Sequence, residues 1–355
     1  MHVEPVADAD FEDFVRVHGH PVPIEQSPRW DAFDATLTGR SPWRRLAVWA
    51  TADADQPAPL SAQTDMPVAV IALTHYAGRG FHYLWARHGP VWLTEPSPRH
   101  ERQLRDALRA YVSAEDPQID FLRLHAHHEA DDLKPLLQTI TYDRTVQIDL
   151  TVPVDERMAA LSKSTRKKLR RTLEDEAVVI ADETALAAED FSEYYNILEE
   201  TAERDGFGVY GPEVYQSMVR TLEPAARVFV ARRTDQGPEP ELTPGRAVSW
   251  ILCTAHDGIG TNYYSGQTAE GRATNVGVRL RWELCAILAA EGVRTYDLMG
   301  VDSPRAPTLA GVGAFKRQFG PEIDVAGAWD VPLKPLRYRV LTLLLRAKRL
   351  MRARH

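Results

Sequence analysis

Two segments of the sequence repeat the same order of apolar runs and turns, and this repetition limits the folds open to the chain. Residues 44–80 and 226–260 each begin with a short apolar run, cross a proline-rich acidic loop and enter a second apolar run. Both second runs end at a glycine-bearing turn followed by an aromatic segment. Runs of β-branched and aromatic residues between turns are typical of strands, and Asp257-Gly258 is a hairpin signal. The alternative is chance resemblance, because strand–loop–strand patterns are common.

A helix and a further strand are expected after each hairpin. In the first half, helical spacing within 99–116 precedes a strand-like run over 119–127. In the second half, one apolar helical stripe is expected to begin after an N-cap at Thr274 or Asn275 and to stop at Gly292. Residues 294–301 then predict a strand. Helices are also expected before the second sheet, over 155–175, 188–205 and 211–223.

The length of the chain agrees with two domains. A chain of 355 residues is too long for one comfortable hydrophobic core. The repeats therefore predict an α/β fold with two related domains that meet near residue 150, the first over 1–150 and the second over 151–320.

The composition is that of a folded protein without a disulfide framework. Hydrophobic residues make up 44% and charged residues 26% of the chain. Cys253 and Cys285 lie inside apolar runs, which favours buried free thiols and a reducing cytoplasm. The acidic N-terminus has no apolar core of a secretory signal, and no apolar run approaches membrane-spanning length. We therefore expect a cytoplasmic protein, soluble or peripheral to a membrane.

Two basic segments stand out against a net charge of −8. Residues 163–171 concentrate six cations, and residues 333–355 carry many cations and no acid. Such segments could meet RNA, phosphate-bearing substrates or an anionic membrane surface. The alternative for each is a solvated helix face.

The stretch 311–325, GVGAFKRQFGPEIDV, combines cations, aromatic rings and glycines. Phe315 and Phe319 lie four residues apart, which places both rings on one helical face. Between them, Lys316 would supply a point charge that stabilises an oxyanion or a phosphate. The alternative is an ordinary amphipathic turn with exposed cations.

Two further segments offer candidate binding residues. Arg204 lies at a helix end and could bind a diphosphate, with Tyr210 nearby; the alternative is a helix-end salt bridge with Gly206 as the C-cap. Tyr263 and Tyr264 are expected on opposite faces of a strand, one in the core and one toward a cleft.

Covalent catalysis and metal chemistry lack candidates in the sequence. No GxSxG, Walker A, HExxH or Rossmann motif is present, and both cysteines have apolar neighbours. His125 and His127 would share a strand face, but no remote Cys or His pair completes a metal site, so we expect no metal. The remaining mechanism is the direct transfer of a group between two bound partners, driven by their positioning and by stabilisation of charge.

Several short motifs, in order from about residue 25 to the C-terminus, together resemble the FemABX aminoacyltransferases, which extend the stem peptide of peptidoglycan precursors. The motifs are EQSPRW, which contains Trp30, YLWARHGPVW, the junction from IDLTVPVDERM to DEAVVI, TAERDGF, YDLMGV, GVGAFKRQFG and WDVPLKPLRYRVLTLLLRAKRL. The resemblance implies two tandem acetyltransferase-like (GNAT) domains, without a coiled-coil arm. It also implies that the C-terminal helix, within 321–355, packs back on the first domain.

The same resemblance implies the reaction and its partners. The donor would be an aminoacyl-tRNA, the acceptor a muropeptide linked to UDP or to a lipid, and no other cofactor would take part. Lys316, next to Phe315, would steady the oxyanion that forms when the acceptor amine attacks the ester. The implied substrate-binding residues are Arg204, Tyr210, Tyr263, Tyr264 and Trp30. The implied contacts with tRNA or a membrane are Lys163, Arg166, Lys167, Arg170 and Arg317.

Two departures from the family pattern affect these expectations. Members that bind a nucleotide-linked acceptor often have a lysine shortly after the early tryptophan, where this chain has Asp34 and no lysine. An acid often follows the Gly-Pro element, where this chain has Leu93 and Thr94, with Glu95 the nearest acid. The general base therefore stays unassigned.

We expect an aminoacyl-tRNA-dependent transferase that acts on a cell-wall peptide precursor, in the cytoplasm or at the inner face of the plasma membrane. An acyl-CoA N-acyltransferase on the same fold is the nearest alternative, although QTAEGRATNVG has few glycines for a pyrophosphate cradle. A tRNA-dependent amide-bond enzyme of natural-product synthesis is a second alternative. A non-catalytic RNA- or membrane-binding protein is a third.

Overall fold

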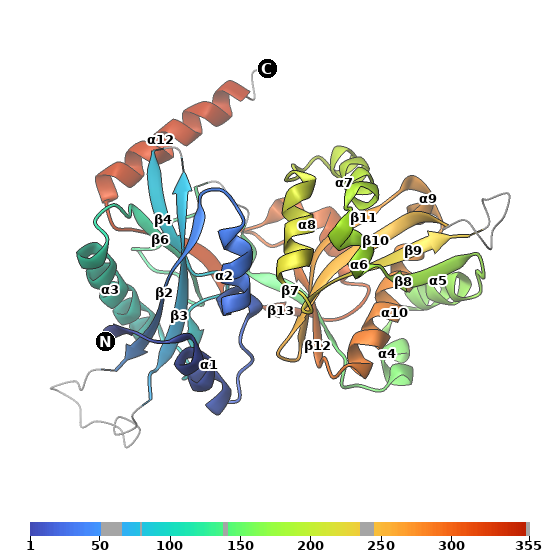
Figure 1. Cartoon of the computed structure of the whole chain (residues 1–355), viewed down its shortest axis with the longest axis horizontal. Coiled ribbons are helices and arrows are strands. Elements are labelled where there is room, and N and C mark those ends of the chain that lie inside the picture. The colour runs from blue at the N-terminus through green and yellow to red at the C-terminus, as the bar shows by residue number, and fades with distance from the viewer. Residues whose placement is uncertain (51–65, 79, 138–140, 235–244, 353–355) are drawn as a thin grey trace. The chain divides into compact units, whose positions relative to one another are not determined.

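The computed structural model describes residues 1–50, 66–78, 80–137, 141–234 and 245–352, and it divides into two compact units (Figure 1). Unit 1 comprises Met1–Asp143 together with Val325–His355, and unit 2 comprises Arg144–Asp324. Unit 2 is therefore an insertion between two parts of unit 1. The boundaries predicted at 150 and 320 lie a few residues from these.

Unit 1 is built on one mixed sheet. Its strands are β1 (His2–Pro5), β2 (Arg40–Trp49), β3 (Ala69–Gly78), β4 (Phe81–Trp85), β5 (Val91–Trp92), β6 (Phe121–Ala126) and β14 (Gly327–Pro332). They are ordered β1-β2-β3-β4-β6-β14, with β5 beside β3. β4 and β6 run parallel, and the other neighbours run antiparallel. The described α-helices of this unit are α1 (Asp8–Val17), α2 (Pro28–Ala35), α3 (Pro98–Glu115) and α12 (Pro335–Arg352).

Helix α3 shows how the sequence sets these elements. Ser97 caps it by accepting a hydrogen bond from His100 N at 3.1 Å, and a proline occupies its first turn. Leu104, Leu108 and Val112 form its buried stripe and pack in the core of the sheet. Burying such a stripe is the main source of stability for a helix of this length.

Unit 2 is built on a second mixed sheet. Its strands are β7 (Arg144–Asp149), β8 (Val178–Asp182), β9 (Ala226–Arg233), β10 (Arg246–His256), β11 (Ile259–Gln267), β12 (Thr295–Gly300) and β13 (Glu322–Asp324), ordered β13-β7-β12-β11-β10-β9-β8. Its described α-helices are α4 (Val154–Ala160), α5 (Lys163–Leu173), α6 (Thr184–Glu189), α7 (Ser192–Asp205), α8 (Pro212–Thr221), α9 (Ala269–Ala273), α10 (Val276–Ala290) and α11 (Ala310–Lys316). The two mixed sheets confirm the predicted fold class.

Strand β7 belongs to the second sheet. The predicted boundary at 150 placed this apolar run at the end of the first domain, but β7 pairs with β12 and β13. At the other end of the unit, Asp324 pairs with Arg144 in the register of β13 and β7. The chain therefore enters and leaves unit 2 through two neighbouring strands.

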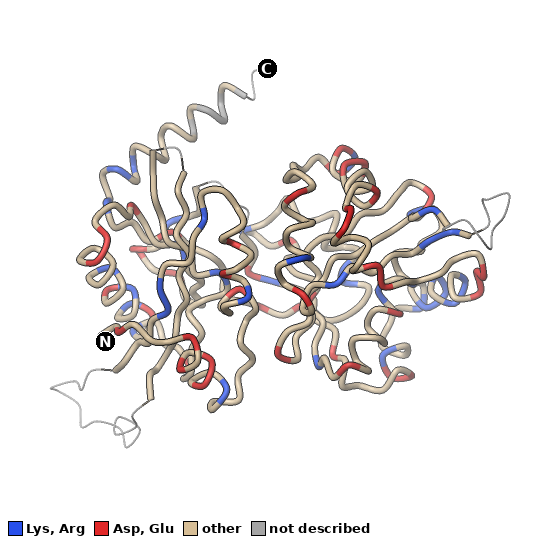
Figure 2. Tube along the Cα trace, viewed as in Figure 1, with Lys and Arg blue, Asp and Glu red and all other residues tan. Residues whose placement is uncertain are grey.

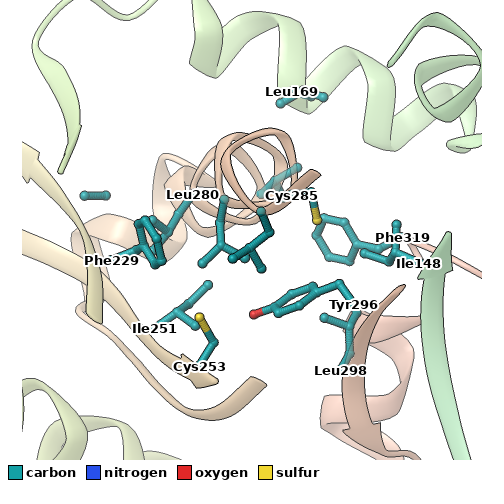
Figure 3. Close-up of a cluster of buried hydrophobic side chains, with 14 of the residues drawn as sticks. Ile148, Leu169, Phe229, Ile251, Cys253, Leu280, Cys285, Tyr296, Leu298 and Phe319 are labelled. Carbon is teal, nitrogen blue, oxygen red and sulfur yellow. The ribbon is translucent and has the colours of Figure 1, made fainter. Parts of the chain in front are cut away.

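The core of unit 2 lies between α10 and the sheet. Figure 3 shows side chains from α10, β10 and β12 meeting around Tyr296, with Cys253 and Cys285 among them. Both cysteines are free and buried, as predicted. Burial raises the pKa of the Cys285 thiol to about 12, so neither thiol is an activated nucleophile.

Three local expectations can be compared with the structure. The hairpin at Asp257-Gly258 is confirmed, with positive φ angles of 48° and 79° joining β10 to β11. The single helix expected over 155–175 is wrong, because α4 ends before Leu161 and Ser162 caps a new helix, α5, by accepting from Thr165 N at 3.1 Å. The helix expected at 275 does follow Asn275, which has a φ of 59° and makes no side-chain cap.

The C-terminal segment is tied to unit 1 by a buried ion pair. Arg123 Nε donates to Asp330 Oδ1 at 2.7 Å and its Nη2 donates to Oδ2 at 3.2 Å, which joins β6 to β14. The Tyr338 hydroxyl donates to Asp330 Oδ2 at 2.9 Å and brings α12 to the same carboxylate. Tyr338 also packs with Phe121 and Leu137. Helix α12 therefore lies on unit 1, and it begins at Pro335 after β13 and β14.

We predict that Asp330→Asn destabilises unit 1 by about 3 kcal/mol, because it leaves the Arg123 charge buried without its counter-charge. Hydrogen exchange of the β6 and β14 amides in urea measures this, since the two units need not unfold together. Tyr338→Phe is the matched control and should cost about 1 kcal/mol, because it removes one hydrogen bond only. Equal effects of the two variants would contradict the prediction.

Candidate functional site

Lys316 is the last residue of α11 and reaches the end of β12. Its ammonium group donates a hydrogen bond to the Gly300 carbonyl at 2.8 Å, and the side chain is partly buried. Helix α11 lies close to the loop after β12 because Gly313 has no side chain: a Cβ there would stand 2.2 Å from Asp302 Oδ1. The Lys316 ammonium is therefore held at the sheet and does not point into bulk water.

The surroundings of Lys316 lower its pKa to about 8. The largest cause is burial, which disfavours the charged form, and the second is the positive charge of Arg281. The carboxylate of Asp297 acts in the opposite direction. Lys316 consequently combines a positive charge at neutral pH with a proton that it can release near that pH.

Arg281, on α10, is a second cation beside Lys316. It is 8% exposed, and its guanidinium lies over the Phe315 ring at 4.8 Å. It donates long hydrogen bonds to Gly277 O at 3.3 Å and to Ser265 Oγ at 3.4 Å. Burial lowers the pKa of its guanidinium.

Arg281 differs from the other buried arginines of the described chain. Arg45, Arg105 and Arg123 each form an ion pair with an aspartate at 2.9 Å or less. Among the described residues, no carboxylate lies within 4.0 Å of the Arg281 guanidinium. A buried charge without a partner is costly, so this region is electrostatically suited to an anion.

Asp297 on β12 is held by three donors. It accepts from Thr145 Oγ1 at 2.5 Å, from Gln147 Nε2 at 3.0 Å and from the Met299 amide at 2.6 Å. Met299 has a φ of 61°, which is unusual for a residue other than glycine, and the pairing of β12 with β7 shifts register between Asp297 and Gly300. This irregular strand end presents the Gly300 carbonyl to Lys316.

Strands β11 and β12 pair over a short distance only. The parallel register runs from Ile259 opposite Thr295 to Thr261 opposite Asp297, and the remainder of β11 has no partner in β12. The part of β11 that has no partner in β12 includes Ser265, which accepts a hydrogen bond from Arg281. The separation of the two strands therefore lies next to both cations.

Phe315 and Phe319 meet as their spacing predicts. The ring centroids lie 5.2 Å apart at an interplanar angle of 66°. The cation over the Phe315 ring is Arg281, however, whereas Lys316 is bound by a carbonyl. Gly313, in the same helix, leaves room for the side chain of Asp302.

Arg204 and Tyr210 lie at the end of α7 and in the segment after it. Arg204 donates to both carboxylate oxygens of Asp205, at 2.9 and 3.0 Å, and to Gln267 O at 3.3 Å. Gly206 ends the helix with a φ of 73°. These contacts match the helix-end salt bridge that was the alternative to diphosphate binding. They also place Arg204 beside the end of β11. Tyr210 is 52% exposed, and its backbone amide donates to the Tyr215 hydroxyl at 3.1 Å.

Tyr263 and Tyr264 do not follow the alternation expected of a regular strand. The register between β10 and β11 shifts at this point, and Tyr263 has no Cα partner in β10. Their ring centroids are only 6.4 Å apart, and both rings are partly exposed. The Tyr264 ring packs edge-on against Tyr215 at 4.8 Å. The expectation that one ring is in the core was wrong because of this bulge.

Trp30 and Arg317 have other partners in the structure. Trp30 lies in unit 1, is 3% exposed and packs against Phe33, so its ring belongs to the core. Arg317 forms ion pairs with Asp302, at 2.8 Å, and with Glu322. These carboxylates offset the positive charge of Arg317, which was predicted to contact tRNA or a membrane.

Helix α5 presents unpaired cations. Its buried face consists of Thr165, Leu169 and Thr172. The exposed cations are Lys163, Lys167, Arg170 and Arg171, and none of them forms an ion pair with a described residue. Figure 2 shows these positions as a run of blue along α5. Arg166 is different, because it donates to the carbonyls of Ala159, at 2.6 Å, and Leu161 at the end of α4.

Described residues of unit 2 line a larger and a smaller hollow. The larger, of about 410 Å³, is lined by residues at the β10–β11 turn and the end of α10, at the opposite end of the sheet from Gly300. The smaller, of about 150 Å³, is lined mainly by apolar side chains that include Trp282, Cys285 and Phe319, together with Asp149, Glu156, Arg157 and Arg281. Of the two cations of the site, Arg281 lines this hollow and Lys316 does not. Among the described residues, no group of three or more metal-ligating side chains is placed to hold a metal ion.

Sequence patterns missed Arg281, Asp297 and Ser265. Arg281 follows Leu280, a member of the apolar stripe of α10. The sequence pattern alone does not distinguish a buried arginine at this position from an exposed one at the edge of the stripe. Asp297 lies in an otherwise ordinary strand, and its two side-chain donors come from β7, which is about 150 residues away. The signal that could have identified Arg281 was its position, as a charged residue, within an apolar helix stripe.

No described helix has the combination of length and low polarity that crossing a bilayer requires.

Comparisons with known proteins agree with this architecture. Residues 159–317 match the family model described as acetyltransferase (GNAT) domain. The crystal structure of FemX is similar over 96% of this chain and 100% of its own, with 15% identity and a TM-score of 0.72. The C-terminal domain of a putative lysylphosphatidylglycerol synthetase from Agrobacterium fabrum is similar over 96% of each chain, with 13% identity and a TM-score of 0.52.

A conserved protein of unknown function from Bacteroides thetaiotaomicron is also similar, over 92% of this chain and 98% of its own, with 8% identity and a TM-score of 0.52. No curated protein matches the chain by sequence. At these identities the solved structures show the fold. The resemblance to FemABX proteins is confirmed at that level, and the GNAT match supports an acyltransferase, as predicted.

We predict that the Lys316 ammonium titrates near pH 8 and that Arg281→Met raises its pKa toward the ordinary value of 10.5, because a neighbouring positive charge is removed. NMR of protein labelled with ¹³C at the lysine ε-carbon measures both values, and Lys316→Gln identifies the resonance. Asp297→Asn should lower the pKa further. A midpoint near 10.5 in the unsubstituted protein, or no response to Arg281→Met, would refute the assigned causes.

Proposed function

We propose that the protein is an acyltransferase of the Fem type, which moves the aminoacyl group of an aminoacyl-tRNA to an amine on the stem peptide of a peptidoglycan precursor. The observation that carries this proposal is Lys316, held at the end of β12 beside Arg281, with which no described carboxylate pairs. The GNAT match over 159–317 and the FemX fold support the class of reaction. The aminoacyl-tRNA is the co-substrate, and the proposed reaction needs no other cofactor.

The two cations suit the charge that this reaction creates. The acceptor amine attacks the ester carbonyl of the aminoacyl-tRNA, and the carbonyl oxygen becomes an oxyanion in the tetrahedral intermediate. Lys316 and Arg281 stabilise that oxyanion in surroundings with little water, where a fixed positive charge is most effective. Collapse of the intermediate forms the amide and breaks the bond to the ribose oxygen of the tRNA.

Proton transfer completes the step. The attacking amine loses one proton, and the departing ribose oxygen gains one. Lys316 has a pKa of about 8, so it can donate its proton to the ribose oxygen and regain one from solvent. No side chain is assigned as the base for the amine.

Helix α5 would bind the tRNA. Its exposed face carries Lys163, Lys167, Arg170 and Arg171, and nucleic-acid affinity comes mainly from such contacts with phosphates. The Arg166 side chain would act indirectly, because its bonds to the carbonyls of α4 hold the start of α5.

The contacts of α10 favour this donor over acyl-CoA. An acyl-CoA pyrophosphate commonly needs the open N-terminus of a helix and close approach at glycine. Here Gln267 covers Gly277 in the first turn of α10: a Cβ on Gly277 would stand 2.8 Å from Gln267 Nε2. An acyl-CoA would have to displace this amide.

The acceptor is an amine-bearing peptide. It is linked either to a lipid or to UDP. Asp34 occupies the neighbourhood where related proteins often have a lysine, and it is fully buried in an ion pair with Arg40 at 3.0 Å. It therefore offers nothing to a nucleotide diphosphate. A soluble acceptor from natural-product synthesis is the alternative within the same chemistry.

We predict that Lys316→Ala lowers kcat/KM for aminoacyl transfer by about 100-fold to 1000-fold, the usual loss when one oxyanion donor is removed. The assay follows a new amide between radiolabelled aminoacyl-tRNA and muropeptide acceptors linked to lipid or UDP, with and without RNase. Lys134→Ala is the matched control, since Lys134 is an exposed lysine of unit 1 that bonds to the Asp131 carbonyl. Transfer from acyl-CoA that is equally fast without RNA would refute the proposed donor.

We also predict that Lys167→Gln combined with Arg170→Gln raises KM for the aminoacyl-tRNA while kcat stays unchanged. The slope of log affinity against log salt concentration should fall by about one for each lost phosphate contact. Arg16→Gln, on the exposed face of α1, serves as the control for loss of surface charge. An unchanged salt slope would show that α5 does not meet the RNA.

A further inference from the structure

Helix α12 has two apolar faces, and the described residues of unit 1 cover only one of them. The covered face includes Tyr338, Leu341 and Leu345, which pack with Phe121 and Leu137. A helix that is apolar on opposite sides is normally buried on both. Within the part of the chain that the structure describes, the second face of α12 therefore has no partner, although its composition is that of a buried face.

The second face forms a continuous stripe at helical spacing. Its members are Leu336, Val340, Leu343, Leu344 and Met351, and each is between 54% and 77% exposed. Positions separated by three or four residues lie on one side of a helix, so these side chains share one surface. The stripe is therefore a surface feature of α12 along its length, and Figure 1 shows the end of this helix projecting beyond the sheet of unit 1.

The charge of the segment has one sign. Residues 334–352 contain lysine or arginine at seven positions and no aspartate or glutamate. Lys334 and Arg337 lie 3.4 and 3.0 Å from the Asp120 carboxylate and hold the start of α12 on unit 1. Arg339 is exposed and has no ion-pair partner among the described residues.

We propose that α12 is a membrane-surface helix that lays its exposed apolar stripe into the headgroup region of a bilayer rich in anionic lipid. An apolar stripe flanked by cations and free of acids is the pattern of helices that lie in this interface. Each cation near an anionic leaflet adds to the attraction, so the lysines and arginines of this segment strengthen binding. With 18 residues the helix is about 27 Å long, and it would lie along the surface.

This occupant fits the stripe better than two others. RNA would use the cations and leave the leucines exposed, whereas a second copy of this chain would bury the leucines but bring like charges together. A bilayer with anionic headgroups satisfies both features at once. The proposal is independent of the acyl-transfer chemistry, because it concerns binding alone.

Vesicle sedimentation of the full-length protein tests the proposal. The probes are vesicles of phosphatidylcholine and phosphatidylglycerol in equal parts, and vesicles of phosphatidylcholine alone. We expect binding to the mixed vesicles, at least about tenfold weaker binding to phosphatidylcholine alone, and a decline as salt is raised.

Leu343→Gln combined with Leu344→Gln should weaken binding to the mixed vesicles by about tenfold or more, since two apolar side chains no longer enter the bilayer. Glutamine is a good helix former, so α12 itself should persist, as circular dichroism can verify. Leu186→Gln on α6 is the matched control, because Leu186 is a comparably exposed leucine, at 56%, outside α12. Arg339→Glu should weaken binding to the mixed vesicles specifically.

Retention of full vesicle binding by the double glutamine variant would overturn the proposal. So would a dimer in solution that the same variant dissociates, if neither vesicle type binds the unsubstituted protein. Equal loss in Leu186→Gln would also overturn it, because a general effect of exposed leucines would then explain the result. An intact vesicle response in Lys316→Ala separates this binding from the acyl-transfer proposal.

Discussion

The buried ion pair between Arg123 and Asp330 determines how the chain is organised. It joins a strand from the first part of the sequence to one that follows the whole of unit 2. Because β14 must return to β6, unit 2 is an insertion whose two ends meet as β7 and β13. That meeting also fixes the segment just before β13, which carries Lys316 on α11. The site in unit 2 thus depends on the way in which the inserted unit is closed.

Within unit 2, the separation of β11 from β12 makes room for charge. Two strands that paired along their whole length would satisfy their backbone groups with each other. Here the pairing stops at Thr261 and Asp297, and the strand end instead presents Gly300 to the Lys316 ammonium. Arg281 lies beside it on an aromatic ring, and no carboxylate in the described ranges pairs with it. The positive charges of Lys316 and Arg281 repel each other, and a bound anion would offset this repulsion. That stabilisation is the physical basis of the proposed chemistry.

The sequence predicted the features that depend on local spacing. The hairpin strands of both sheets, the strand that follows the helix in each half, the Asp257-Gly258 turn and the meeting of Phe315 with Phe319 follow from periodicity and turn residues. It could not predict features that depend on distant partners. The role of β7 is set by strands at the far end of unit 2, and the bulge at Tyr263 is set by the way in which β11 pairs with β10. The partners of Arg281 are likewise visible only in three dimensions.

The two basic helices differ in what accompanies their charge, and this difference separates their partners. The exposed face of α5 combines Lys163, Lys167 and Arg170 with serine and further arginine, so it offers charge with little apolar surface. Such a face suits a hydrated phosphate backbone, where contacts are polar and easily exchanged. Helix α12 combines its cations with an exposed apolar stripe. Phosphates alone would leave that stripe in water, whereas a lipid surface takes up both, so similar charge on the two helices implies different ligands.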